Sequence, residues 1–262
     1  MAKTDLKDIT FMIPLKIDTV DRVLNLIMVT EFLLDHFDTK IQILETGHFN
    51  NKLLSKLLSA DIKYSFIEDF DPVYYRTYYI NQMVKKCDTP NVAIWDSDVL
   101  ALPAQITMAV NWLRNDEADF VYPYEFKFLD TSKDVRELYF KTRDFAVLER
   151  NRSKMKEMYA PKPVGGAFMA RLDKYIKSGI ENTRLYGWGV EDGERICRWT
   201  NLGYRVKRAE GALFHLTHDR GMNSYFTFEQ GEEKKLELTR IFAMNKEEME
   251  NEIKTWKDFN QS

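Results

Sequence analysis

The sequence predicts an α/β fold with a mostly parallel central sheet flanked by helices. Four short apolar runs, at residues 8–15, 39–45, 62–68 and 91–96, are separated by segments with helical periodicity. Strands that alternate with helices are typical of βαβ units, which build parallel sheets. The chain contains no internal repeat, low-complexity tract or linker rich in Pro, Ser or Gly. We therefore expect one continuous domain over residues 1–262.

The first unit consists of a strand and a long helix. The run DITFMIPL (residues 8–15) predicts a buried strand, which we expect Pro14 to end. Residues 18–37 begin with polar side chains and then repeat apolar ones at helical spacing. The repeating residues are Val23, Leu24, Ile27, Val29, Phe32, Leu33 and Leu34.

The remaining elements follow in order along the chain. TKIQILE, IKYSFIE and NVAIWD predict the next three strands, and the segments at 49–59 and 74–87 predict helices between them. After about residue 104 the pattern loosens. It predicts a helix at 104–116, a strand at 119–125, a charged helical stretch from Lys133 to Met158 and a charge-rich helix at 229–258.

Bulk composition argues against several classes of protein. Lys and Arg number 38 and Asp and Glu 41, a formal charge of −3, so no global field recruits nucleic acid or anionic lipid. No signal peptide is recognisable, and no window approaches the roughly 20 apolar residues of a membrane span. Cys87 and Cys197 match no metal or redox spacing and predict reduced thiols. We expect a cytoplasmic protein; peripheral attachment to a membrane surface stays open.

Two carboxylates, Asp96 and Asp98, end the fourth strand in the stretch NVAIWDSDVLALP. Ligands bind at the carboxyl ends of strands in open α/β sheets. Like charges this close repel unless a cation lies between them, and hard divalent ions prefer oxygen ligands. An ordinary turn explains Asp and Ser here equally well. The motif alone leaves a turn and a metal site open.

Two of the four histidines, His215 and His218, lie three residues apart in FHLTHDRG. Neutral imidazole is the commonest nitrogen ligand for metals, which favours a metal site. The alternative is one core and one surface histidine. If both join Asp98, the mixed oxygen and nitrogen set favours manganese over magnesium.

The segment LYGWGVEDGE carries an acidic pair, Glu191 and Asp192, behind Trp188. An indole offers a flat face on which a sugar ring can stack, and a carboxylate beside it can take a proton from a hydroxyl. The alternative is a glycine-rich turn with the tryptophan in the core. The pair Gly165 and Gly166 leaves a close backbone approach to substrate and a tight turn equally open.

Together these segments resemble the GT-A glycosyltransferases. Within them they are similar to the C-terminal domain of β-1,4-galactosyltransferases and to bacterial polysaccharide glycosyltransferases. The shared order is strand-Pro, an R…N helix, D-x-D, G-G, G-W-G-x-E-D and H-x-x-H, from about Phe11 to Arg220. The G-W-G-x-E-D block is the specific part. The resemblance implies a GT-A, Rossmann-like fold with a nucleotide-binding half at about 8–103, an acceptor and metal-completing half at about 104–228 and a helical segment at about 229–262.

The resemblance also implies a metal centre and a catalytic base. Asp96 and Asp98 match D-x-D, whose second carboxylate binds the metal that bridges the donor diphosphate. His218 matches a histidine ligand of the family, and His215 stands where the galactosyltransferases have a methionine. The implied metal ligands are therefore Asp98, His215 and His218, for Mn²⁺ or Mg²⁺. Asp192 matches the base.

The remaining matches concern the two substrates. Pro14, Arg76 and Asn81 match the nucleotide-binding strand and helix. The resemblance therefore implies that they bind the nucleotide donor together with Asp96 and Asp98. The acceptor and donor sugars are implied to lie against Trp188, Glu191, Gly165 and Gly166. Two departures stand out. Val190 replaces a glycine of the family pattern, and in PLKIDTVDR either Lys16 or Arg22 has to stand in for an arginine-rich loop.

The implied function is a metal-dependent, inverting glycosyltransferase. Asp192 takes the proton of a glycan acceptor hydroxyl as it attacks a nucleotide diphosphate sugar, with uridine the expected base. A retaining glycosyltransferase, a nucleotidyltransferase and a non-catalytic sugar- or nucleotide-binding module remain as alternatives. We also expect residues 219–231 to close over bound donor.

Overall fold

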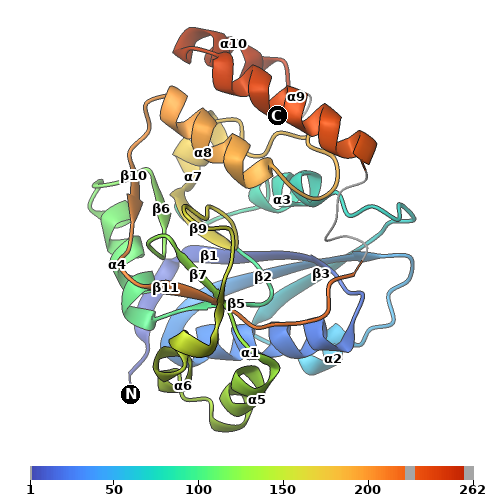
Figure 1. The fold of residues 1–262 in the computed structure, drawn as a ribbon, viewed down its shortest axis with the longest axis vertical. Coiled ribbons are helices and arrows are strands. Elements are labelled where there is room, and N and C mark those ends of the chain that lie inside the picture. The colour runs from blue at the N-terminus through green and yellow to red at the C-terminus, as the bar shows by residue number, and fades with distance from the viewer. Residues whose placement is uncertain (1, 222–227, 257–262) are drawn as a thin grey trace.

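The computed structural model describes residues 2–221 and 228–256, with the backbone alone at 228–230. Within these ranges the strands form a seven-stranded and a four-stranded sheet (Figure 1). The larger sheet has the order β10 (Val206–Arg208), β6 (Phe120–Tyr122), β9 (Ala167–Arg171), β4 (Asn91–Trp95), β1 (Thr4–Lys16), β2 (Phe37–Gly47) and β3 (Ile62–Glu68).

The larger sheet is mostly parallel, as predicted. β4, β1, β2 and β3 run parallel, and β10 is parallel to β6. Only β9, among the described strands of this sheet, runs against its neighbours β4 and β6. The predicted mixed α/β class is confirmed.

The smaller sheet was not predicted. Its order is β5 (Val99–Ala101), β11 (Ala212–His215), β7 (Lys127–Asp130) and β8 (Lys156–Glu157). β11 pairs antiparallel with β5, so that His215 lies opposite Val99, and parallel with β7, so that His215 lies opposite Asp130. These strands are two to four residues long. Such short strands show too little alternation to stand out in a sequence.

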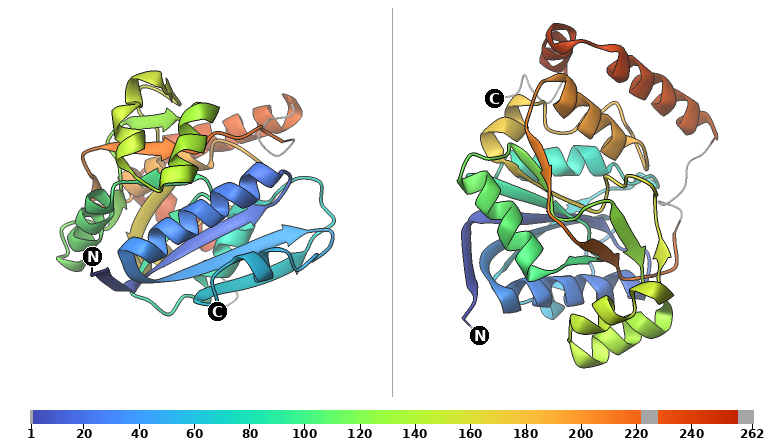
Figure 2. Two further views of the ribbon diagram at one scale, coloured as in Figure 1. Left: turned by 90° about the horizontal axis from the view of Figure 1, so that it is seen from below. Right: turned by 60° about the vertical axis from the view of Figure 1, so that its left-hand side comes forward.

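Helices cover both faces of the larger sheet. α1 lies on one side of β1, β2 and β3, and α3 lies on the other side; α9 and α10 form an outer layer beyond α8 (Figures 1 and 2). The helices are α1 (Val20–His36), α2 (Leu54–Leu57), α3 (Arg76–Val84), α4 (Pro103–Arg114), α5 (Lys133–Thr142), α6 (Ala146–Arg150), α7 (Leu172–Lys177), α8 (Glu191–Asn201), α9 (Phe228–Ala243) and α10 (Lys246–Lys254).

Four predicted boundaries are wrong. β1 continues through Pro14 to Lys16. Beyond Met12 it pairs, among the described strands, only with β2 and has no neighbour on its other side, so the backbone N–H that proline lacks is not needed there. The helix expected at 49–59 is a single turn, α2. The helix expected from Lys133 to Met158 ends at Thr142, where Arg143 adopts a left-handed conformation (φ 56°), and α6, a 3₁₀ turn and β8 follow.

The fourth wrong boundary is in the C-terminal helix expected at 229–258, which consists of α9 and α10. The break has a local cause, because the Asn245 side chain accepts from the backbone N–H of Glu248 at 3.1 Å and starts a new helix. Cys87 and Cys197 are both free thiols. Within the described residues, no helix has the length and apolar character needed to cross a membrane.

Candidate active site

The turn between β4 and β5 carries Asp96 and Asp98. The buried indole N–H of Trp95 donates to the Val99 carbonyl oxygen at 2.9 Å and thereby closes the turn around both carboxylates. The backbone N–H of Asp96 donates to the Gly166 carbonyl oxygen (2.9 Å), which ties the turn to the segment before β9. The site therefore begins at the carboxyl end of a central strand, where the sequence predicted it.

The smaller sheet brings the two histidines to Asp98. The backbone N–H of Leu216, just beyond β11, donates to the Asp98 carbonyl oxygen at 2.7 Å. His218 Nε2 lies 3.1 Å from Asp98 Oδ2, and His215 Nε2 lies 3.8 Å from Asp98 Oδ1. One ligand atom from each of the three residues falls within 4.8 Å of the others. One oxygen and two nitrogens in this arrangement suit a divalent transition ion such as Mn²⁺.

The charges around Asp98 favour its ionised form. Burial alone would raise the pKa of Asp98, but His215, His218 and Arg22 outweigh burial and hold this pKa well below its usual range. Arg22 Nη1 lies 3.9 Å from Asp98 Oδ2, and Arg22 also pairs with Asp18. Of the two cations that the sequence offered beside the donor, Arg22 therefore faces the cluster, whereas the Lys16 ammonium donates to the backbone oxygens of Asp71 and Pro72.

A carboxylate that the sequence did not point to orients His215. Asp130 lies at the end of β7, and its Oδ1 lies 2.7 Å from His215 Nδ1. This contact leaves His215 Nε2 on the Asp98 side. A carboxylate behind a ligating imidazole fixes its tautomer and its direction. The only sequence signal was an acid at the end of the short apolar run KFLD.

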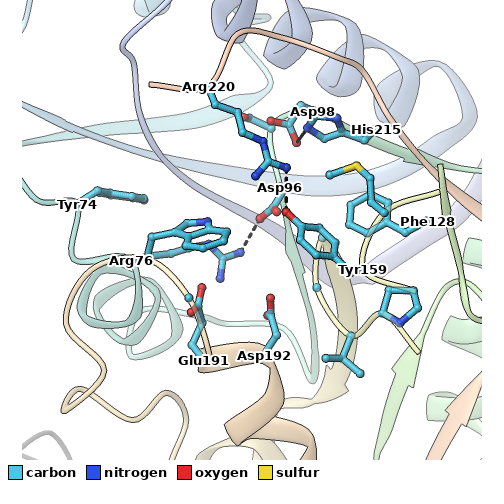
Figure 3. Close-up of a pocket in the computed structure, with 18 of the residues that line it drawn as sticks. Tyr74, Arg76, Asp96, Asp98, Phe128, Tyr159, Glu191, Asp192, His215 and Arg220 are labelled. Atoms are coloured by element: carbon cyan, nitrogen blue, oxygen red, sulfur yellow. Dashed lines mark hydrogen bonds and ion pairs between the residues drawn. The ribbon is translucent and has the colours of Figure 1, made fainter. Parts of the chain in front are cut away.

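A cavity of about 440 Å³ opens beside the cluster. Its lining includes most of the expected site residues, namely Pro14, Arg76, Asp96, Asp98, Gly165, Gly166, Trp188, Glu191, Asp192, His215 and His218. Figure 3 shows Glu191 and Asp192 rising from the start of α8, on the opposite side of the cavity from Asp98 and His215. Arg76, at the start of α3, donates to Asp96 Oδ1 at 2.6 Å between these two groups.

Asn81 is a correction to the expected donor contacts. Its side chain is fully buried and it does not line the cavity. Its Nδ2 donates to the Glu181 carbonyl oxygen (3.0 Å), and its Oδ1 accepts from the Glu181 N–H (2.9 Å). Asn81 lies five residues after Arg76, so the two point to different sides of α3.

The two acids of α8 differ in environment. Asp192 is partly exposed, and its Oδ1 accepts from Arg195 Nη1 at 2.7 Å. A Cβ added at Gly165 would meet the other oxygen, Oδ2, at 2.6 Å. Glu191 is buried, and its Oε2 has no hydrogen-bond partner in the described part of the chain. Burial, followed by repulsion from Asp192, raises the pKa of Glu191 to about 7 against the opposing effect of Arg76.

Backbone conformation shapes the loop before α8. Gly187 and Gly189 have φ of 80° and 99°, and Val190 also adopts a left-handed conformation with φ 63°. A β-branched residue rarely takes this conformation. Gly166 is required as well, because at its φ of 83° an added Cβ would meet Leu213 at 2.7 Å and Phe128 at 2.9 Å. The tight-turn interpretation therefore holds for Gly166.

The cavity has further lining residues that the sequence did not single out. Tyr159 is half exposed and accepts from Arg220 Nη2 at 3.0 Å. Lys162 and Met158 also contribute. Behind Trp188, the buried Lys234 ammonium of α9 donates to the Trp188 carbonyl oxygen at 2.6 Å. Of the segment 219–231 that we expected to close over donor, residues 222–227 lie outside the described residues.

Comparison with solved structures shows the fold. The catalytic domain of Drosophila β1,4-galactosyltransferase 7, in complex with xylobiose, is 16% identical and has a TM-score of 0.54; 88% of this chain and 79% of that chain are covered. A mannosyltransferase from Pyrobaculum calidifontis, in complex with GDP-Man and Mn²⁺, is 15% identical with a TM-score of 0.53, covering 82% of this chain and 58% of that one.

A mycobacterial protein of 17% identity is also similar, with a TM-score of 0.52, and the match covers 87% of this chain and 71% of that chain. No family model matches the sequence. No curated protein matches it either. At these identities the likeness concerns the fold, and this chain has the GT-A glycosyltransferase fold.

Proposed function

We propose that this chain is a metal-dependent glycosyltransferase that moves a sugar from a nucleotide diphosphate sugar to the hydroxyl of a glycan acceptor. One observation carries the proposal. A single cavity has a cluster of one carboxylate and two imidazoles on one side and the carboxylate of Asp192 on the other. Two proteins of similar fold, the galactosyltransferase and the mannosyltransferase named above, are sugar transferases.

The proposed metal ligands are Asp98, His215 and His218, and the proposed ion is Mn²⁺ or Mg²⁺. A bound divalent ion would act as a Lewis acid that stabilises the charge gathering on the departing diphosphate. The chain prepares this site without the ion. Asp130 orients His215, and Arg22 adds a fixed positive charge beside Asp98.

The proposed base is Asp192, and the proposed stereochemistry is inversion. The acceptor oxygen forms a bond to the anomeric carbon, the bond from that carbon to the diphosphate oxygen breaks, and the acceptor proton passes to Asp192 Oδ2. General-base help of this kind is typically worth about 10²- to 10⁴-fold in rate. The position of Asp192 across the cavity from the metal ligands supports attack from the face opposite the leaving group.

The remaining lining residues are proposed to hold the two substrates. Pro14, Arg76 and Asp96 lie on the donor side, and we propose a uridine nucleotide there. Trp188, Glu191, Gly165 and Gly166 also line the cavity and are proposed to contact the sugars. Glu191 in its neutral form can donate a hydrogen bond to an acceptor hydroxyl, and in its charged form it can accept one.

The alternatives leave features of the site unused. A non-catalytic sugar-binding module needs the flat face of Trp188 but neither a cluster of metal ligands nor an oriented carboxylate. A retaining transferase needs no base on the face opposite the leaving group. A nucleotidyltransferase is disfavoured by the sequence, which has no glycine-rich basic loop after β1.

The experiment is a screen of nucleotide diphosphate sugars with Mn²⁺, in which released nucleotide diphosphate and sugar transfer to glycan acceptors are measured. Asp192→Asn should lower transfer by about 10²- to 10⁴-fold. Asp173→Asn is the matched control, because Asp173 is also the second residue of its helix but lies outside the cavity. Equal transfer by both variants, or no release from any donor by the wild type, would contradict the proposal.

A further inference from the structure

Helix α8 carries two arginines that are almost fully buried and nearly equivalent. Arg195 Nε and Nη2 donate to the two oxygens of Glu181, both at 2.8 Å. Arg198 Nε and Nη2 donate to the two oxygens of Glu194 at 2.8 and 3.1 Å. Buried ion pairs of this kind are weak evidence for stability, because desolvation offsets most of the attraction. A contact that only one of the two arginines makes therefore points to a role other than stability.

The difference is a third contact. Arg195 Nη1 donates to Asp192 Oδ1 at 2.7 Å, whereas Arg198 Nη1 and Nη2 donate to the backbone oxygens of Ser178 and Ile180, which belong to the scaffold. Both guanidinium groups are 0–1% exposed. Only Arg195, of the two, connects the buried interior to a carboxylate of the cavity.

Glu181 is itself fixed from behind. Its carboxylate accepts from the Tyr175 hydroxyl as well as from Arg195. Its backbone is held at both the N–H and the carbonyl oxygen by the Asn81 side chain. The face of the Arg195 guanidinium packs on the Phe168 ring, 4.5 Å from the ring centre. Glu181 and Phe168 thus fix the position and orientation of the Arg195 guanidinium independently of its contact with Asp192.

Arg195 contacts one oxygen of the Asp192 carboxylate and does not contact the other. Oδ1 is held by Arg195, while Oδ2 lies on the side of Gly165, where only the absence of a Cβ leaves room for it. The Asp192 side chain is 34% exposed, so it would otherwise have rotational freedom. A base must lie within hydrogen-bonding reach of the proton it takes, and misplacement by about 1 Å can cost about 10²-fold in rate.

We propose that Arg195, held by Glu181, is a positioning residue that fixes the direction of Asp192 and keeps Oδ2 turned toward the acceptor hydroxyl. The proposal rests on the proposed function, in which Asp192 is the base. It gives the network of Asn81, Glu181 and Arg195 a role in transfer that a purely structural ion pair does not have. A lysine in place of Arg195 keeps the charge but cannot make the two-pronged contact with Glu181 and reach Asp192 at the same time.

The test compares Arg195→Lys with Arg198→Lys, each also measured for thermal unfolding. Both variants weaken a buried pair on the same helix, so both should lose stability to a similar extent. Arg195→Lys should lower kcat for sugar transfer by about 10-fold or more, and it should leave the affinity for nucleotide diphosphate with Mn²⁺ unchanged. Arg198→Lys should change neither. In an Asp192→Asn background, Arg195→Lys should cause no further loss of kcat.

A crystal structure of each lysine variant separates this proposal from the proposed function. The Asp192 carboxylate should keep a single conformation in Arg198→Lys and should become disordered or change conformation in Arg195→Lys. This result does not depend on knowing the sugar donor. An unchanged Asp192 conformation in Arg195→Lys would overturn the positioning role. An equal fall in kcat for both lysine variants, or an additional loss in the Asp192→Asn background, would overturn it as well. Absence of transfer in the wild type would instead refute the function.

Discussion

His218 Nε2 lies 3.1 Å from Asp98 Oδ2, although 120 positions separate the two residues. The smaller sheet produces this contact, because β11 pairs with β5 directly after the turn that carries Asp98. The larger sheet supplies the strand end and the smaller sheet supplies the imidazoles. The proposed metal site thus depends on the junction of two sheets.

Gly165→Ala should impair transfer without unfolding the chain. An added Cβ would meet Asp192 Oδ2 at 2.6 Å, and Asp192 cannot yield freely because Arg195 holds its other oxygen. We expect kcat to fall about 10-fold or more with a small change in the melting temperature. Gly47→Ala, at the end of β2 and outside the cavity, is the control, since a Cβ there makes only an ordinary contact with Phe66 at 3.9 Å. Equal kcat values for the two variants would argue against the close approach of Gly165 to the base.

Asp130→Asn should weaken metal binding through His215. The Asp130 carboxylate lies 2.7 Å from His215 Nδ1, and loss of such a partner typically costs about 10- to 100-fold in metal affinity. Calorimetric titration with Mn²⁺ in the presence of UDP measures the effect. Asp88→Asn is the control, because that side chain is exposed and pairs with Lys40. An affinity for Mn²⁺ that is the same in both variants would count against the proposed ligand set.

Glu191→Gln should change how stability depends on pH. The pKa of Glu191 is raised from its usual 4.5 to about 7, because burial disfavours the charged form. A raised carboxyl pKa contributes stability that is fully present below the unfolded pKa and is lost as pH rises through the folded one. The free energy of unfolding of the wild type should therefore fall relative to that of Glu191→Gln between about pH 4.5 and 7, by at most about 3 kcal/mol.

Above about pH 7 the difference between the two proteins should stay constant, since Glu191 is then ionised in both the folded and the unfolded state. Urea unfolding at several pH values measures it. A difference that does not vary with pH between 5 and 8 would show that the Glu191 carboxyl titrates normally.

Val190→Gly should stabilise the protein. Val190 has φ 63°, and a left-handed conformation costs a residue with a Cβ roughly 1–2 kcal/mol, more than glycine loses in backbone entropy. We expect the free energy of unfolding to rise by about 1 kcal/mol in Val190→Gly. Val190→Ala controls for loss of the side chain, because it keeps the Cβ and should show no such gain. If Val190→Gly is no more stable than Val190→Ala, the left-handed backbone conformation of Val190 does not destabilise the protein.

Local patterns predicted the strand end at Asp96 and Asp98 and most of the parallel sheet, because each of those strands is a short apolar run between helical segments. They failed where long-range contacts decide the structure. The strands that bring Asp130 and His215 together are four residues each and gain their order by pairing across 85 positions. Asn81 shows the same limit, since its partner Glu181 is 100 residues away. The helix start at Asn245 was missed for a different reason, because the capping pattern of Asn245 and Glu248 is local and lies within the single helix that was expected at 229–258.

The most direct test of the central claim is calorimetric titration of UDP and GDP into the wild type and Asp98→Asn, with and without Mn²⁺. The account predicts that Mn²⁺ strengthens nucleotide binding to the wild type, and that Asp98→Asn loses this enhancement by more than about 100-fold, since even residues that only orient a ligand are worth about 10- to 100-fold. Nucleotide binding that is equally strong without Mn²⁺, or an enhancement that survives in Asp98→Asn, would contradict it.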